Sequence, residues 1–216
     1  MGAHRYTLLD VFTATPLEGN ALAVVHGADP LDEQTMLAMA RETRLSETTF
    51  VQQSHLAGAD YRTRIWTVEG ELPFAGHPSL GTAVAVARAD GVGPQQQARY
   101  VQETGAGLQP IDVRVEDDHR AHASMLQEPV VRGPEVGRAA PLAAIGLTPE
   151  HADRGLPPQI VSTGLAQLIV PLRDRDALTR ARPDWAAIEP LLAEMEGERP
   201  RVGGDVVVVA DGTLRL

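Results

Sequence analysis

Short apolar runs separated by polar turns fill the first half of the chain, and this pattern predicts a mixed α/β fold. The runs that we predict as strands are Tyr6–Phe12, Leu22–Val25, Thr48–Gln52, Tyr61–Trp66, Ala98–Gln102, Leu108–Glu116 and Ala123–Leu126. Two segments have the spacing of a helix instead. The first begins at Asp32, which can cap it, and the second begins near His77-Pro78, where proline suits the first helical position.

The pattern changes after Gln127, where closely spaced prolines and glycines predict a crossover that ends near Gly155. We expect a first domain at 1–127 and a reduced second domain at 128–200. The elements expected after the crossover are strands at Gln159–Ser162 and Leu168–Leu172, a helix from Asp184 to about Met195 that Pro190 kinks or breaks, and a hairpin of Asp205–Ala210 and Thr213–Leu216 around Asp211-Gly212. This C-terminal hairpin, at 201–216, could pack back on the first domain.

Composition excludes several classes of function. The 216 residues include 19 lysines and arginines against 29 aspartates and glutamates, a formal net charge of −10, which disfavours a nucleic-acid partner. There is no cysteine, so disulfides, thiolate metal sites and cysteine nucleophiles are excluded. No apolar run approaches the roughly 20 residues of a membrane span, and the first residues do not resemble a secretory signal. We therefore expect a cytoplasmic protein without a membrane partner.

A carboxylate at a helix–strand boundary is the first candidate for proton chemistry. Glu47 lies in the run Leu45-Ser46-Glu47-Thr48-Thr49-Phe50, between a predicted helix end and an apolar strand. It is either a solvated glutamate, which is the commoner situation at such a boundary, or a partly desolvated group that works as a general acid/base. Spacing alone leaves both interpretations open.

The start of the second predicted helix is another candidate site. Gly76 lets a ligand approach the backbone closely, and free N–H groups at a helix start suit a carboxylate. His77 could donate to such a ligand or only cap the helix, and the residues alone favour capping. Asn20, in a turn, more commonly serves local turn chemistry than substrate binding. The histidines show no metal-ligand spacing, and there is no nucleotide-binding glycine motif, so neither a metal nor another cofactor is indicated.

Three motifs occur in a fixed order along the first half of the chain. They are Leu17-Glu18-Gly19-Asn20-Ala21-Leu22-Ala23-Val24-Val25, Leu45-Ser46-Glu47-Thr48-Thr49-Phe50-Val51 and Glu71-Leu72-Pro73-Phe74-Ala75-Gly76-His77-Pro78. Together they resemble the phenazine-biosynthesis isomerase (PhzF) family of the diaminopimelate-epimerase-like superfamily. The likeness is specific over the first half and becomes thinner after Gln127.

The resemblance implies both a fold and an activity. The fold has two similar α/β domains, in each of which a curved mixed sheet wraps a central helix, and the active site lies between them. The activity is a cofactor-independent isomerisation that moves a proton within a small carboxylate-bearing natural-product intermediate, with Glu47 as the acid/base. The substrate-binding residues that the resemblance implies are His77, Gly76, Asn20, Ser46 and Ser79.

The chain departs from the family pattern in ways that bear on function. Trp66-Thr67-Val68 stands where the family usually has Phe-Thr-Pro, a change that could reshape the pocket. The family's Asp-Pro-Ala-Thr-Gly-Ser-like motif, which begins the second central helix, is missing, and we place this internal gap between about Met195 and Arg201. The apolar face left bare needs cover, either from the helix at Asp184 to Met195 or from a second copy, so we expect a homodimer.

Three functions stay open on the sequence. The chain could be a PhzF-type isomerase with a remodelled pocket, a catalytically silent binding homologue, or a lyase or cyclase that works with Glu47 alone. Retention of Glu47 and His77 favours chemistry, whereas the missing second-domain motif disfavours the ordinary isomerisation.

Overall fold

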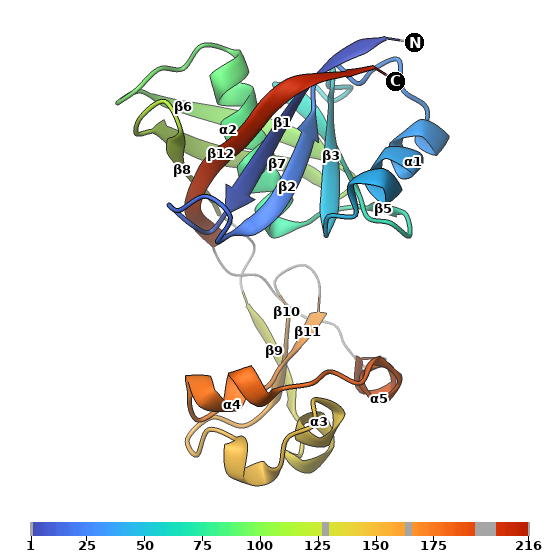
Figure 1. Ribbon diagram of the computed structural model, residues 1–216, viewed down its shortest axis with the longest axis vertical. Helices are drawn as coiled ribbons and strands as arrows, with labels where there is room; N and C mark the ends of the chain where they lie inside the picture. Colours follow the sequence, from blue (N-terminus) through green and yellow to red (C-terminus); the bar gives the residue numbers. More distant parts are fainter. Residues whose placement is uncertain (1, 127–129, 163–165, 193–201, 216) are drawn as a thin grey trace. The chain divides into compact units, whose positions relative to one another are not determined.

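The computed structural model describes residues 2–126, 130–162, 166–192 and 202–215. The chain divides into two compact units, one containing residues 1–126 and 202–216 and the other containing residues 127–201 (Figure 1). The chain therefore leaves the first unit, builds the second and returns to the first with its last strand.

A closed ring of strands forms the first unit. The strands are β1 (Ala3–Val11), β2 (Asn20–Val25), β3 (Glu47–Gln52), β4 (Tyr61–Trp66), β5 (Glu71–Leu72), β6 (Gln97–Thr104), β7 (Gly107–Val115), β8 (Arg120–Met125) and β12 (Val202–Arg215). Their order is β3-β2-β1-β12-β8-β7-β6-β4-β5, and β3 also pairs with β4, which closes a mixed barrel. The β2–β3 and β4–β6 pairs are parallel.

Inward and outward positions alternate along the strands, as the sequence pattern predicts. In β7, Ile111, Val113 and Val115 are buried, whereas Asp112 and Arg114 are exposed. This follows because successive side chains of a strand point to opposite faces. The buried set of β7 belongs to the core inside the barrel.

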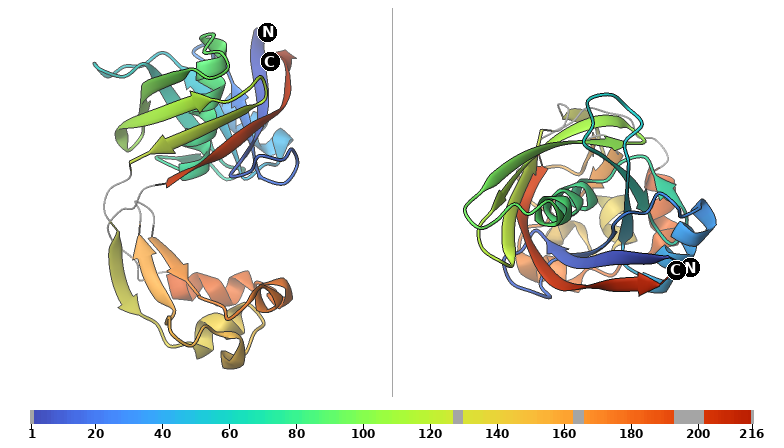
Figure 2. Two further views of the ribbon diagram at one scale, coloured as in Figure 1. Left: turned by 90° about the vertical axis from the view of Figure 1, so that its left-hand side faces the viewer. Right: turned by 90° about the horizontal axis from the view of Figure 1, so that it is seen from above.

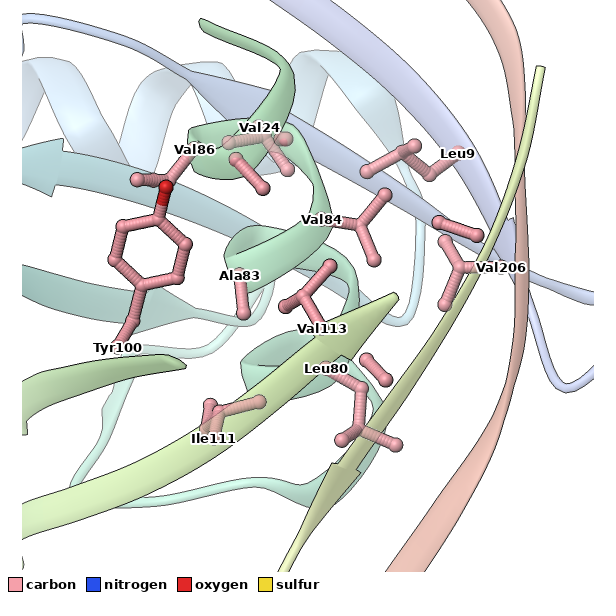
Figure 3. Close-up of a cluster of buried hydrophobic side chains, with 14 of the residues drawn as sticks. Leu9, Val24, Leu80, Ala83, Val84, Val86, Tyr100, Ile111, Val113 and Val206 are labelled. Atoms are coloured by element: carbon pink, nitrogen blue, oxygen red, sulfur yellow. The ribbon is translucent and has the colours of Figure 1, made fainter. Parts of the chain in front are cut away.

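The helix α2 (Gly76–Ala89) fills the inside of the barrel, and Figure 2 shows it end-on within the ring of strands. Every residue from His77 to Ala87 is buried, because a helix that is apolar on all sides needs cover on all sides. Figure 3 shows Leu80 and Val84 of this helix among side chains of the surrounding strands. Each fully buried leucine or valine contributes roughly 1.5–3 kcal/mol.

A second helix, α1 (Glu33–Thr43), lies on the outside of the barrel. It begins where the sequence predicts, because the Asp32 carboxylate accepts a hydrogen bond from the Thr35 amide at 2.8 Å. Its apolar side, with Met36 and Ala40, packs against Phe50 of β3.

Trp66 belongs to this outer layer. It packs in the same cluster as Met36 and Phe50, under α1, because strand alternation directs Trp66 outward while Ile65 beside it points inward. The departure from the family pattern at Trp66 therefore lies on the other face of the wall from the interior helix, and its position does not support an effect on the pocket.

The predicted C-terminal hairpin is wrong. Residues Val202–Arg215 form one long strand, β12, which pairs with β8 through its first part and with β1 along most of its length. A shift of register between Leu8 and Leu9 accommodates the extra residue in β12. The Asp-Gly pair that suggested a turn continues the strand instead, and Asp211 accepts a hydrogen bond from the Thr7 hydroxyl at 2.9 Å. Barrel closure outweighs the local turn preference.

The second unit is a small sheet with helices. Its described elements are β9 (Val131–Glu135), α3 (Ala139–Ala144), a 3-10 turn (Pro149–His151), β10 (Gln159–Ser162), β11 (Ala166–Ile169), α4 (Arg175–Arg180) and α5 (Trp185–Leu192). The sheet order is β11-β10-β9, and Leu142, Leu147 and Ala152 form the centre of a small core.

The predicted crossover is thus partly structured, because β9 and α3 form within it despite its prolines and glycines. The described part of α5 continues through Pro190 and packs against α3 and β11. The gap that we infer between about Met195 and Arg201 lies outside the described residues.

Gly81→Ala tests how tightly α2 fits the barrel wall. An added Cβ would lie 2.5 Å from Leu22 Cδ2 and 3.0 Å from Val11 Cγ2, and both neighbours are fully buried. We expect overpacking to lower the net free energy of unfolding by about 1–3 kcal/mol. This loss remains after the ~1 kcal/mol by which alanine stabilises a helix relative to glycine. Urea unfolding measures this. Gly70→Ala, where the new Cβ meets no atom within 4 Å, is the control, and equal stability of the two variants would contradict the prediction.

Candidate active site

Glu47 is the first residue of β3 and faces the interior helix. Strand alternation places it on the same face as Thr49, whose hydroxyl lies 2.8 Å from the Thr82 hydroxyl of α2. The Glu47 side chain is 16% exposed, so it is not the solvated glutamate of the commoner interpretation. The buried Thr49–Thr82 bond, which the sequence analysis missed, ties α2 to β3 beside it.

His77, the second residue of α2, meets Glu47. Its Nε2 lies 3.3 Å from Glu47 Oε2, and its side chain is 9% exposed. Although this distance suits an ion pair, the two atoms are not in hydrogen-bond geometry, and both are buried without a hydrogen-bond partner in the described chain. The structure thus brings together two residues that lie 30 positions apart in the sequence, and it leaves one polar atom of each available.

Asn20 and Ser46 lie beside this pair and are linked to it. Asn20 Nδ2 is 3.1 Å from His77 Nδ1, and the Ser46 hydroxyl donates to Asn20 Oδ1 at 3.1 Å. Of the sequence candidates, these two therefore form one hydrogen-bonded chain with His77, and the Nε2 atom of His77 in turn lies 3.3 Å from Glu47 Oε2.

The start of α2 contains the remaining candidates. The residue before the helix, Ala75, offers no side-chain acceptor, so the amides of the first turn are left for water or a ligand. Gly76 adds no side chain there. Ser79 differs from the expectation, because it is fully buried and its hydroxyl donates to the Ala75 carbonyl at 2.8 Å. We place Ser79 among the residues that shape the helix start and not among the substrate contacts.

Burial sets the charge of His77. It lowers the pKa of His77 below the ordinary value of 6.5, and the nearby Glu47 carboxylate opposes this only in part. The ring is therefore neutral near pH 7, with one donor and one acceptor nitrogen. A neutral donor beside a carboxylate can anchor a ligand oxygen while the carboxylate takes or gives a proton.

Other kinds of site find no support in the described residues. Within them, no group of three or more histidine, aspartate or glutamate side chains could hold a metal ion. In the same part of the chain, no helix is long and apolar enough to cross a membrane.

Comparison with known proteins shows the family of the chain. The family model "Phenazine biosynthesis-like protein" matches residues 9–200. Trans-2,3-dihydro-3-hydroxyanthranilate isomerase from Pseudomonas aeruginosa is 37% identical over 186 residues, which are 86% of this chain and 63% of that protein. The chain therefore spans less than two thirds of this relative's length.

Solved structures share the fold. A protein described as a predicted epimerase from Pseudomonas aeruginosa superposes with a TM-score of 0.79 at 27% identity, covering 98% of this chain and 99% of that one. A PhzF family protein from Bacillus anthracis superposes with a TM-score of 0.75 at 30% identity, covering 90% of this chain and 64% of that one. Since the family model matches most of the chain and the fold agrees with a solved PhzF structure, this chain belongs to the PhzC-PhzF family of phenazine biosynthesis-like proteins.

Proposed function

We propose that this protein is a cofactor-independent isomerase of PhzF type, which moves a proton between carbons of a small carboxylate-bearing molecule. The observation that supports this best is the contact of Glu47 with His77, in which Oε2 and Nε2 lie 3.3 Å apart and neither has a hydrogen-bond partner in the described chain. Buried polar atoms are nearly always satisfied. Two such atoms side by side, one an acceptor and one a donor, are what a bound substrate would use.

The start of α2 would hold the substrate carboxylate. The first-turn amides form the positive end of the helix dipole, Gly76 leaves room for the ligand, and His77 would donate from Nε2. Glu47 would then take a proton from an adjacent carbon and return it to another carbon. The carbon–hydrogen bond broken at one position is made at the other as the double bond moves, so the reaction needs no oxidant and no co-substrate.

The substrate class follows from the relatives. The Pseudomonas relative is named an isomerase of trans-2,3-dihydro-3-hydroxyanthranilate, and we propose a carboxylate of similar size for this chain. Because the chain spans 63% of that relative, the alternative is a homologue that binds such a molecule without turning it over, or one that uses Glu47 alone for a lyase or cyclase step.

Glu47→Gln should separate binding from chemistry. The amide keeps the shape of the side chain but cannot accept the proton, so turnover should fall by roughly 10² to 10⁴ while binding survives. The measurement is deuterium incorporation from D2O into trans-2,3-dihydro-3-hydroxyanthranilate or its product, with calorimetry for binding.

The control for this change is Glu42→Gln, which alters an exposed glutamate of α1 and should leave turnover unchanged. Full activity in Glu47→Gln would defeat the proposal. Binding without turnover in the wild-type protein would favour the silent homologue.

His77→Gln should make the protein less sensitive to mild acid. Burial holds the pKa of His77 below 6.5 in the folded state, so the unfolded chain binds a proton first as the pH falls. The stability that depends on neutral His77 is therefore present above about pH 6.5 and is lost as the pH drops below that value. Urea unfolding at about pH 7.5 and about pH 5.5 should show a smaller loss in His77→Gln than in wild type. The exposed control His119→Gln should lose as much stability on acidification as the wild type does. If His77→Gln also loses as much as the wild type, the ring is charged in the fold and the prediction is wrong.

We also propose that a second copy of the chain covers the second unit. Large apolar side chains are exposed there, and they are Leu156, Ile169, Leu178 and Trp185. Ile169 is the last residue of the edge strand β11, and exposed apolar side chains of this kind provide surface that water solvates poorly. The cytoplasm stays our prediction for the compartment.

Light scattering tests the dimer. The wild-type protein should have twice the 23.1 kDa of the single chain at micromolar concentration. Trp185, 69% exposed, is the largest of the exposed side chains, and Trp185→Asp should raise the dissociation constant by roughly 30-fold. Leu56→Asp, at an exposed position of the first unit, should not. A wild-type monomer would overturn this proposal without touching the isomerase.

A further inference from the structure

The geometry points to Asn20 and Ser46 as positioning residues that hold His77 in one tautomer, with its proton on Nε2. The tautomer itself depends on hydrogen bonds alone, and only its catalytic consequence rests on the proposed function. The resemblance to the PhzF family implied that Asn20 and Ser46 touch the substrate, whereas their hydrogen bonds give them a different role.

The first observation is the direction of the Asn20 amide. Its Nδ2 lies 3.1 Å from His77 Nδ1, and an amide nitrogen can only donate, so His77 Nδ1 accepts and bears no proton. The Ser46 hydroxyl donates to Asn20 Oδ1 at 3.1 Å. This bond keeps the amide oxygen on the Ser46 side and the amide nitrogen facing the ring.

The second observation comes from the other edge of the ring. Glu47 Oε2 lies 3.3 Å from His77 Nε2, and an ionised carboxylate only accepts. A lone pair on Nε2 would face the negative oxygen, whereas a proton there is attracted to it. Asn20 on one side and Glu47 on the other therefore select the same tautomer. A doubly protonated ring would set two donors against each other at Asn20.

Three elements bring these groups together. Asn20 is the first residue of β2, and Ser46 immediately precedes β3. These strands are parallel neighbours, with Leu22 opposite Glu47, so Asn20 and Ser46 lie at the same end of the pair. His77 is in the first turn of α2, which the barrel holds in place.

The tautomer divides the chemistry between two side chains. With its proton on Nε2, His77 is a donor toward the substrate, and Glu47 is the member of the pair that accepts a proton. If the proton moved to Nδ1, Nε2 would compete with Glu47 as a base and the substrate oxygen would lose its donor. Asn20 and Ser46 thus act through His77.

Nitrogen-15 spectroscopy of the full chain reads the tautomer directly. With labelled histidine, a long-range proton–nitrogen correlation distinguishes the protonated ring nitrogen from the bare one in each of the seven histidines, and His77→Gln identifies the signal of His77. We expect a bare Nδ1 and a protonated Nε2 in wild type. Asn20→Asp places an acceptor opposite Nδ1, so the proton should appear on Nδ1 and the pKa of His77 should rise.

Further variants keep the test decisive. Ser46 is exposed, so Ser46→Ala should fold normally and shift part of the population toward the other tautomer. Asn20→Leu removes the donor that faces His77 Nδ1, so both tautomers should be populated and the two ring nitrogens of His77 should show averaged chemical shifts. Gln52→Leu removes an amide that bonds elsewhere, to the Ala28 carbonyl at 3.0 Å, and should leave the His77 signals unchanged.

Two results would overturn the assignment. One is a wild-type His77 with its proton on Nδ1, and the other is an unchanged His77 signal in both Asn20→Asp and Ser46→Ala. None of these measurements needs a substrate, so a failure here is separate from a failure of the isomerase proposal, which Glu47→Gln tests.

Discussion

The enclosure of one helix by a closed ring of strands is the constraint on which the first unit depends. The helix α2 has no polar side that could face water, since every residue from His77 to Ala87 is buried, so the ring must close around it. The β3–β4 pairing and the insertion of β12 between β1 and β8 provide that closure. The surrounding strands hold this helix on all sides, and its second residue, His77, contacts Asn20 of β2 and Glu47 of β3.

This packing also fixes the positions of the side chains in the candidate site. Catalytic groups need placement to a fraction of an ångström, and here the first turn of α2 is fixed by the barrel, by the Thr49–Thr82 bond at 2.8 Å and by the close approach of Gly81 to Leu22. A buried histidine kept neutral next to a glutamate provides a donor and an acceptor without an added ion. The site thus consists of a few polar atoms at the end of an otherwise apolar core.

The sequence predicted most of the local structure and much less of the long-range structure. Tyr61–Trp66 and Gln159–Ser162 agree with β4 and β10 at both ends, because short β-prone runs and flanking turn residues mark them. The predicted hairpin at Asp211-Gly212 was wrong, because the local sequence does not reveal pairing with β1, which lies some two hundred residues earlier in the chain. Glu47 and His77 were named from resemblance, since spacing could not distinguish a solvated glutamate from a buried one. The hydrogen bond from the Asn20 amide to the His77 ring could not be predicted from the sequence, because it joins side chains that only the fold brings together.

The position of β12 also determines when the first unit can become complete. A ribosome releases residues 1–126 long before β12, and until then β1 and β8 each have an open edge at the place where β12 belongs. The second unit, made in between, can fold while the earlier strands wait. Nascent chains should therefore aggregate or bind chaperones most readily after β8 has emerged. This interval ends when the fourteen residues of β12 pair with β1 and β8 and close the barrel.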